Sequence, residues 1–392
     1  MKKHEVVVVG GGVVGAAAAL AFARQGFSVA LVEKSAAPVP VAPSRPGDYD
    51  LRVYAIAPGS VKFLDSLGAW RTVVATRASA YERMQVWEHG KEQSLAFDAA
   101  ELGVPELGFI VEDRLLRASL WSALGASAAI YAGTTVSAFD DTGERPSLTL
   151  ADGERIEAQL VIAAEGADSK LREWAGIEPG GWTYPQRSIV CNVATERPHQ
   201  RAALQRFLPN GPLAFLPLAD GRYSIVWSTD SAEADELMAL DDDGFRARLD
   251  EAMGHALGAI TSVTKRLAFP LRLLHAQDYV RAGLALVGDA AHVIHPLAGQ
   301  GMNLGLADAQ ALAEVAAEAR AQRKPIGDLR VLRRYERRRK AANIEVMALT
   351  DTLYRLFRSR APGVEMLREI GMALVERAGP IKRRLARRAM GL

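Results

Sequence analysis

The chain has 392 residues, 49% of them hydrophobic and 24% charged, so it is long enough for two or three domain-sized units and is not disordered overall. Its single cysteine, Cys191, excludes an internal disulfide framework, a CxxC redox pair and a cysteine-built zinc site. The net charge of +2 hides an asymmetry, because residues 320–392 hold 20 Lys and Arg against 7 Asp and Glu. Such a basic region predicts an anionic partner (a phospholipid surface, a protein or nucleic acid), with a solvated basic helix as the alternative.

Residues 1–33 have the pattern of a βαβ unit. A β-branched run at 6–9 is typical of a strand buried on both faces of a parallel sheet. Three consecutive glycines end this run, an Ala-rich helix is expected over 15–24, and a second strand over 28–32 ends at Glu33. The uncharged stretch 6–23 superficially imitates a signal peptide, but its glycines and the folded pattern that follows favour a structural element.

Strand and helix patterns follow along the rest of the chain. Four prolines predict an irregular loop over 36–47, and Asp152-Gly153 predicts a hairpin turn. The expected helices cover 60–67 and 115–124, and the expected strands cover 84–87, 94–97, 147–150, 156–163, 187–194, 213–218, 223–228 and 284–287. The strands of the middle stretch predict a mostly antiparallel sheet, and the pattern is helical beyond Asn303.

Gly10, Gly12 and Gly15 form a GxGxxG motif between the first strand and the first helix, and Glu33 closes the second strand. The glycines allow a tight turn and the close approach of a pyrophosphate to the helix N-terminus, where unpaired N–H groups favour anions. Glu33 is suited to accept hydrogen bonds from an adenosine ribose, and its negative charge disfavours a 2′-phosphate. The unit therefore predicts FAD or NAD binding, and tight packing alone is the alternative.

A second motif, LVGDAAHVIHPLAGQGMNLGLADA, occupies residues 286–309. Asp289 follows a buried strand and a glycine, where its carboxylate can hydrogen-bond a polyol. Gly299, Gly301 and Gly305 open a helix whose backbone donors are suited to a phosphate or a carbonyl-rich ring.

This block resembles the flavin-ribityl motif of the flavin-dependent aromatic hydroxylases related to para-hydroxybenzoate hydroxylase. The form HPLAGQGMNLG is most similar to the ubiquinone-biosynthesis hydroxylases of that family. Segments 50–70 (DLRVYAIAPGSVKFLDSLGAW), 205–218 (QRFLPNGPLAFLPL) and 350–392 resemble the family's arginine segment, substrate-domain strands and carboxyl-terminal region.

The resemblance implies an α/β fold. It consists of a Rossmann-like FAD-binding domain, an inserted β-sheet substrate domain and a helical C-terminal region. The FAD-binding segments are expected at 1–75, 101–180 and 276–345, the substrate-domain segments at 76–100 and 181–275, and the basic helical region at 346–392.

The resemblance also implies flavin contacts beyond the first glycine motif. They are Arg52, Arg114, Glu165, Gly288, Asp289, Gly299, Gly301, Met302 and Asn303. Glu165-Gly166 departs from the family's usual Asp-Gly pair, and helix capping by Asp168 or Ser169 is the alternative for that segment. For Arg114 the alternative is a surface ion pair with Glu112 or Asp113.

The implied reaction is hydroxylation of an electron-rich aromatic ring. NADH or NADPH would reduce FAD, O2 would add to the flavin C4a, and the distal oxygen of the hydroperoxide would transfer to the ring, while the protein orients the ring and excludes water. Pro296, through its backbone carbonyl, and His295 are expected to face the flavin as the catalytic residues. Phe215, Leu216, Pro217 and Trp227 are candidates for lining an apolar substrate, with inter-domain core as the alternative.

The expected substrate is a polyprenylated phenol of ubiquinone biosynthesis. The alternatives are another small aromatic, a flavin oxidase or dehydrogenase, and a non-catalytic flavoprotein scaffold of the biosynthetic complex. No metal is expected, because His292 and His295 lack a third ligand at helical spacing. The protein is expected in the cytoplasm or at the inner face of the membrane, docked through its C-terminal region to anionic lipid or to partner proteins, and no nucleic acid is expected as a partner.

The apolar residues of that tail recur at helical spacing. One stripe consists of Leu349, Leu353, Leu356 and Phe357, and a second of Leu367, Ile370 and Leu374. After Gly379-Pro380 come five basic residues and a thin apolar stripe, namely Lys382, Arg383, Arg384, Arg387 and Arg388 with Ile381 and Leu385. This pattern predicts reversible docking to an anionic bilayer, and packing on the protein's own body is the alternative.

Overall fold

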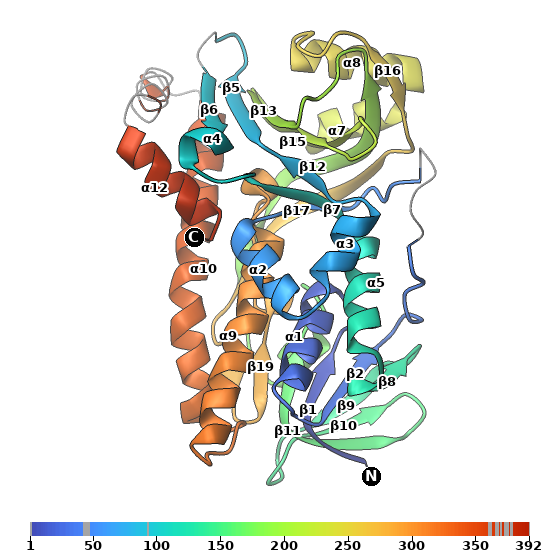
Figure 1. Ribbon diagram of the computed structural model, residues 1–392, viewed down its shortest axis with the longest axis vertical. Coiled ribbons are helices and arrows are strands. Elements are labelled where there is room, and N and C mark those ends of the chain that lie inside the picture. The colour runs from blue at the N-terminus through green and yellow to red at the C-terminus, as the bar shows by residue number, and fades with distance from the viewer. Residues whose placement is uncertain are drawn as a thin grey trace.

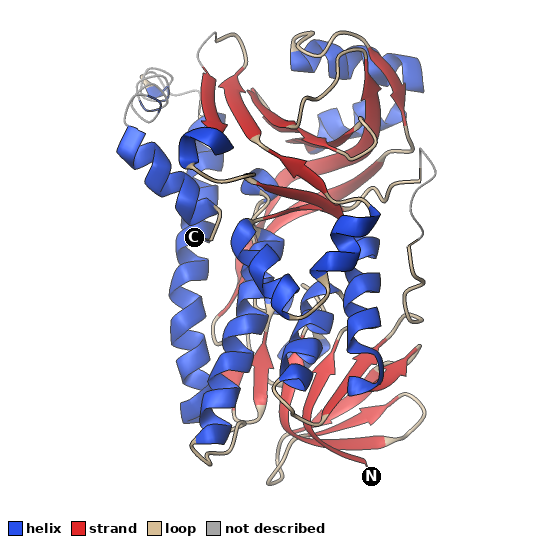
Figure 2. Ribbon diagram, in the orientation of Figure 1, coloured by secondary structure: helices blue, strands red, loops and turns tan. Residues whose placement is uncertain are grey.

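The computed structural model describes residues 2–41, 48–91, 94–359 and 379–391, together with Gly363, Val364, Arg368, Gly371 and Glu376. Figure 1 shows one sheet in the lower half of the molecule and a second in the upper half, with a long helix, α10, along one side. Figure 2 shows a group of helices in the middle of the molecule, between the strands of the lower and upper halves, and further helices beside the upper sheet.

The lower sheet has a parallel centre built from segments far apart in the chain. Its strands run in the order β18-β19-β11-β1-β2-β8, and β10 and β9 extend it from β11. They are β1 (Lys2–Val9), β2 (Val29–Glu33), β8 (Ala129–Ala132), β9 (Val136–Asp140), β10 (Ser147–Leu150), β11 (Arg155–Ala163), β18 (Val280–Arg281) and β19 (Leu284–Leu286). The strand expected at 6–9 is confirmed, and these four valines are at most 5% exposed in a core that they share with helix α1 and with β10.

Helices α1 (Val13–Arg24), α5 (Asp113–Leu124) and α9 (Gly301–Ala321) pack together beside this sheet. The small side chains of α1 let it approach its neighbours closely, and Ala16 to Ala19 are fully buried. The remaining helices of this half are α2 (Pro58–Ser66), α3 (Trp70–Thr76), α6 (Lys170–Trp174) and α10 (Leu329–Arg358). A 3-10 turn, η1 (Gly125–Ser127), follows α5.

The upper sheet is antiparallel except where β13 pairs with β5, which confirms the mostly antiparallel middle stretch. Its strands are β5 (Arg83–Glu88), β6 (Ser94–Asp98), β12 (Pro179–Thr195), β13 (Ala202–Leu208), β14 (Gly211–Pro217), β15 (Tyr223–Asp230), β16 (Ile260–Val263), β17 (Leu267–Ala276) and β20 (His292–Val293). One face packs against α7 (Ser231–Ala239) and α8 (Asp242–Met253) around a second apolar core.

A small three-stranded sheet connects the two halves. It consists of β3 (Val53–Ile56), β7 (Gly108–Glu112) and β4 (Ser79–Tyr81), and the short helix α4 (Ala99–Leu102) lies nearby. Two further 3-10 turns, η2 (Gly288–Ala290) and η3 (Pro296–Ala298), lie between β19 and α9. Tyr49, Ile110 and Leu218 form the apolar contact between this sheet and the end of β14.

The end of the described chain packs back on the body. Helix α12 (Gly379–Ala389) places Ala386 beside Ala99 and Leu102 of α4, and the carbonyl of Met390 accepts a 2.9 Å hydrogen bond from the N–H of Gly59. Lys382 is buried and lies 2.8 Å from Glu376. This face of α12 therefore packs on the protein's own body, which was the alternative to membrane docking. Arg383, Arg384 and Arg387 of the same helix are exposed.

The expected apolar stripes are only partly seen. Leu349 is 54% exposed, whereas Phe357 stacks on Phe207 of the upper sheet with ring centroids 3.6 Å apart. Leu367, Ile370 and Leu374 lie outside the described residues. Within the described ranges, no helix combines the length and the apolar character needed to cross a bilayer.

Candidate functional site

The predicted cofactor residues meet at one edge of the lower sheet. Gly10 follows β1, Glu33 ends β2, and Glu165 and Gly288 come after β11 and β19. These strands are parallel neighbours in the order β19-β11-β1-β2, so their carboxyl ends share one edge. Ligands of open parallel sheets bind at that edge.

The glycine turn leaves open space at the N-terminus of α1. Gly10 has φ +104°, and a Cβ there would lie 2.3 Å from the carbonyl oxygen of Ala164. A Cβ on Gly15 would lie 1.8 Å from the carbonyl oxygen of Gly10, whereas a Cβ on Gly12 would meet no atom within 4 Å. No side chain caps α1, so its first N–H groups face this space, which suits a pyrophosphate.

Glu33 holds the turn from the neighbouring strand. Its carboxylate accepts a 2.5 Å hydrogen bond from the N–H of Gly11 and a 3.0 Å bond from that of Ser35. The indole Nε1 of Trp121 donates to the carbonyl of Gly11 over 2.8 Å. Glu33 thus stiffens the loop, and its contact with an adenosine ribose stays a prediction.

Asp289 lies in the η2 turn, and part of the residue is exposed to solvent. Its carboxylate is nevertheless surrounded by protein atoms that displace water from it. This crowding raises the pKa of Asp289, and the nearby guanidinium groups of Arg52 and Arg272 oppose the rise. Arg52 is also exposed, and its guanidinium attracts the Asp289 carboxylate electrostatically. The cluster offers both hydrogen-bond acceptors and a positive charge to a polar ligand chain.

Glu165, in the loop after β11, points toward the start of α6. Its Oε2 accepts hydrogen bonds from the Ser169 hydroxyl over 2.6 Å and from the Leu171 N–H over 3.1 Å. Burial raises the pKa of Glu165 above its ordinary value, and these hydrogen bonds offset only part of the rise. Ser169 is the N-cap of α6, and Asp168 pairs with Arg272 at 2.9 Å, so the capping interpretation describes this segment as it stands.

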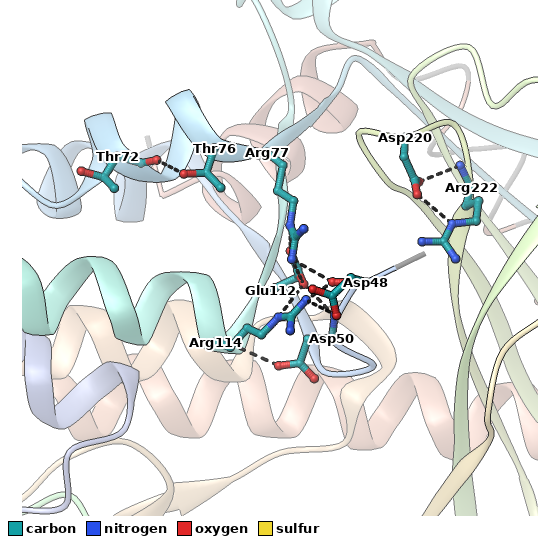
Figure 3. A network of polar contacts seen from close by, with 9 residues as sticks. All are labelled: Asp48, Asp50, Thr72, Thr76, Arg77, Glu112, Arg114, Asp220 and Arg222. Carbon is teal, nitrogen blue, oxygen red and sulfur yellow. Dashed lines mark hydrogen bonds and ion pairs between the residues drawn. The ribbon is translucent and has the colours of Figure 1, made fainter. Parts of the chain in front are cut away.

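Arg114 belongs to a polar network at the start of α5, drawn in Figure 3. The Arg114 Nε lies 3.2 Å from a carboxylate oxygen of Glu112, and its Nη2 lies 3.2 Å from a carboxylate oxygen of Asp48. Arg77 also pairs with Glu112. The backbone N–H of Arg114 donates to Asp50 over 3.3 Å. This arrangement matches the ion-pair alternative, and a flavin contact by Arg114 stays a prediction.

His295 lies in the interior rather than on an open surface. It is 0% exposed, its Nε2 lies 3.2 Å from Gln186, and its ring packs against Tyr184 and Tyr354. Desolvation lowers its pKa to about 4, so the ring is neutral at pH 7. A fully buried ring cannot touch a cofactor in this conformation, and the placement favours a packing role. Pro296, next in the chain, is only half-buried and begins η3.

The glycine-rich start of α9 is fastened to β3 and α2. The Asn303 Oδ1 accepts hydrogen bonds from the Ala57 N–H (2.9 Å) and the Ser60 hydroxyl (2.8 Å), and its Nδ2 donates to the Ala55 carbonyl (2.9 Å). The Asn303 side chain is thus occupied by hydrogen bonds within the protein. Gly299 is left-handed at φ +60°, and Gly301 and Met302 form the first turn of the helix.

The four expected substrate residues do not share one face of the upper sheet. Phe215 and Trp227 point into the core beneath α7 and α8, at 0% and 2% exposure. Pro217 is also buried, whereas Leu216 points to the opposite face and packs against the cluster of Tyr49, Ile110 and Leu218. Since neighbouring residues of a strand alternate between faces, the idea of one face carrying all four is wrong.

Sequence reasoning overlooked the half-buried residues beside Leu216. Ala214 lies on the same face of β14 as Leu216, and Val226 is its paired neighbour on the adjacent strand β15. It also overlooked Asp308, a fully buried carboxylate on α9 that binds His292 and Arg339. The sequence feature that could have pointed to Asp308 is its position as the one acidic residue in the mainly apolar run GLADAQALA.

A cavity of about 720 Å³ lies elsewhere, beside β5, β6 and β13. None of the glycine-motif residues, Asp289 or Pro296 lines it. Among the residues that the structure describes, no three His, Cys, Asp or Glu side chains are grouped as metal ligands.

The edge of the lower sheet thus fits a dinucleotide, with a pyrophosphate space at Gly12 and a carboxylate at either end. Residues 3–350 match the family described as the FAD binding domain. This chain belongs to that family. The expected FAD cofactor and the resemblance to flavin-dependent hydroxylases are thereby confirmed.

Relatives of this flavoprotein match over its whole length. It is 40% identical to the 3-demethoxyubiquinol 3-hydroxylase of Escherichia coli (strain K12), over 99% of this chain and 98% of the relative. It is 38% identical to the ubiquinone hydroxylase UbiL of Rhodospirillum rubrum, over 100% of this chain and 90% of the relative. The structure of p-nitrophenol 4-monooxygenase PnpA from Pseudomonas putida DLL-E4 superposes with a TM-score of 0.78 at 22% identity, covering 98% and 97% of the two chains, which confirms the expected fold.

Gly12→Ala should fold normally and lose FAD. The added methyl meets no protein atom, but it projects into the space in front of α1 where the pyrophosphate would lie. We expect the free energy of unfolding of the apoprotein to change by less than about 0.5 kcal/mol and the dissociation constant of FAD to rise about 10-fold or more. Denaturant unfolding and flavin-fluorescence titration measure the two. Gly15→Ala is the contrasting variant, since its methyl would clash with the Gly10 carbonyl and destabilise the fold itself.

The buried His295 should make the protein acid-sensitive. Its pKa is about 4 in the folded state and near 6.5 when unfolded, so between these values only the unfolded chain binds the proton. Stability should therefore fall as the pH drops from about 6.5 to 4, by at most ~3 kcal/mol from this residue. Urea unfolding between pH 7 and 4.5 should show a smaller loss for His295→Gln than for the wild type and for the exposed control His89→Gln. Equal losses in all three proteins would contradict the assignment.

Proposed function

We propose that this flavoprotein monooxygenase hydroxylates the aromatic ring of a polyprenylated phenol in ubiquinone biosynthesis, with NADH or NADPH as reductant and O2 as the oxygen source. The 40% identity to 3-demethoxyubiquinol 3-hydroxylase over nearly the whole of both chains carries the proposal. The FAD-binding edge supports it, because the residues that would hold the cofactor are assembled there.

Each part of that edge has a separate task in holding the cofactor. The backbone at Gly12 and the N-terminus of α1 receive the pyrophosphate, and Glu33 orients the ribose beside it. Asp289 would accept hydrogen bonds from the ribityl chain, and Arg52 lies near enough to balance its charge. When bound, FAD supplies the electron transfer and oxygen activation, so the protein's contribution is orientation and the exclusion of water.

The substrate side is formed by the face of β14 and β15 opposite the α7–α8 core. Ala214, Leu216 and Val226 are half-buried and apolar there, and Leu216 packs against the same small apolar cluster as Ala55 of β3. A Cβ on Gly299 would lie 3.4 Å from Ala55, so this strand also borders the turn that begins at Pro296. We propose that this apolar face orients the phenol ring toward that turn.

A polyprenylated phenol should accelerate flavin reduction by NAD(P)H far more than para-hydroxybenzoate does. The reason is that the proposed face is apolar and offers no cationic side chain to a benzoate carboxylate among Ala214, Leu216 and Val226. Stopped-flow absorbance of the bound flavin measures the reduction rate with each compound. An equal or larger response to para-hydroxybenzoate would contradict the proposed substrate, and reduction by an organic substrate without nicotinamide would identify an oxidase or dehydrogenase instead.

We further propose that the protein works as a peripheral enzyme at an anionic membrane surface. Arg383, Arg384 and Arg387 are exposed on α12, whereas Lys382 is paired with Glu376 and is not available to lipid. Three arginines near a charged surface contribute about 3 kcal/mol in total, enough for reversible docking. Such docking suits a substrate whose prenyl tail stays in the bilayer. The competing partner is a protein of the biosynthetic complex.

Replacing Arg383, Arg384 and Arg387 together by Gln should weaken binding to anionic vesicles by roughly 100-fold. Co-sedimentation with phosphatidylcholine vesicles, with and without phosphatidylglycerol, measures this on the full-length protein. A matched variant replaces three exposed arginines of α10 by Gln, namely Arg330, Arg333 and Arg337. If the α12 variant binds like the wild type, or only the α10 variant loses binding, α12 is not the membrane contact.

A further inference from the structure

A buried carboxylate on α9 touches three separate segments around the flavin-binding turn. Asp308 is 0% exposed, and its Oδ2 accepts hydrogen bonds from the Gly288 N–H (3.2 Å) and from the His292 Nε2 (2.6 Å). Its Oδ1 accepts from the Arg339 Nε (2.8 Å) and the Asn343 Nδ2 (3.2 Å), both on α10. All four donors therefore converge on one side chain.

The first of these donors lies directly beside Asp289. Gly288 begins η2 in the left-handed region at φ +58°, and its N–H bond to Asp308 fixes the turn from behind. Gly305, one turn before Asp308 on α9, lies so close that a Cβ there would come within 3.2 Å of the Gly288 Cα and 2.6 Å of Val14. The turn thus packs closely between α1 and α9.

Helix α10 completes this support from the outside. The Arg339 Nη2 also donates to the Asn343 Oδ1 over 2.9 Å, so these two α10 side chains hold each other as well as Asp308. The Tyr335 hydroxyl donates to the Leu286 carbonyl over 2.7 Å, which ties the same helix to the strand that leads into η2. Burial raises the pKa of Asp308, but His292 and Arg339 outweigh this and hold the pKa below its ordinary value.

We infer that Asp308 is a positioning residue for the flavin half of the cofactor: it holds the Gly288–Ala290 turn so that Asp289 can meet the ribityl chain, and Arg339 and Asn343 of α10 hold the Asp308 carboxylate in place. This rests on the proposed FAD site. A carboxylate has no protons to donate, so its four acceptor positions match four surrounding donors. An amide of the same shape would face these donors with an NH2 group and would leave Arg339 without its counter-charge.

Asp308→Asn should lower FAD affinity by about 10-fold or more while ADP affinity stays within about 2-fold of the wild type. ADP occupies only the glycine-motif half of the site, at Gly12 and Glu33, which Asp308 does not contact. Flavin-fluorescence titration gives the FAD dissociation constant, and competition of ADP against FAD gives that of ADP. The visible circular dichroism of the residual bound flavin should change as well, since the ring and ribityl chain lose their fixed orientation.

The matched control is Glu314→Gln, on the same helix. Glu314 also joins α9 to an arginine of α10, Arg338 at 2.7 Å, but it lies at the surface and does not touch the turn. It should leave FAD affinity, ADP affinity and the dichroism unchanged. Arg339→Lys, which keeps the charge, is the second variant in case Asp308→Asn does not fold, and it should also weaken FAD binding without weakening ADP binding.

Three outcomes would overturn the inference. One is unchanged FAD affinity in a folded Asp308→Asn protein, or in Arg339→Lys if that is the only folded variant. Another is an equal loss of FAD and ADP affinity, which would mean general destabilisation of the domain. The third is a loss of the same size in Glu314→Gln. A wild-type protein that binds no FAD would instead refute the proposed function, so the two failures are distinguishable.

Discussion

The parallel pairing of β1 with β2 and β11 is the constraint on which the rest of the structure depends. In this register Val9 lies opposite Ala163, so the chain turns at Gly10 directly against the carbonyl of Ala164. Only a residue without a side chain fits that approach, and only a second glycine at position 15 lets α1 begin so close to the turn. The same register brings the ends of strands from distant parts of the sequence to one edge.

The upper sheet depends on a different rule, the alternation of side chains along each strand. Phe215 fills a core beneath two helices, while its neighbour Leu216 faces the flavin-binding half of the molecule. The apolar surface available to a substrate is therefore set by every second residue of β14 and β15, and the largest aromatic side chains belong to the stability of the domain instead.

The helical end of the chain serves the lower sheet rather than standing apart from it. Arg339 and Asn343 reach the buried Asp308, Tyr335 holds the end of β19, and Met390 of the tail bonds to Gly59. A buried charge is tolerated in α9 because donors surround both of its oxygens. On α12 the outward arginines Arg383, Arg384 and Arg387 are exposed and available to an external partner.

The sequence by itself determined the local elements and the class of the site. The valine strand, the GxGxxG turn and Glu33 are close in the chain, so their spacing alone specifies a dinucleotide-binding βαβ unit, and the block at Asp289 identified the flavoprotein family. Only the tertiary structure decided which side chains are available for chemistry. His295 belongs to the same block but is fully buried against β12 and α10, Arg114 is paired with Asp48, 66 residues earlier, and Asp308 meets Arg339 and Asn343 of a helix that begins 21 residues later at Leu329. Such contacts depend on how distant elements pack and on which face each residue occupies, and no local pattern of residues encodes either.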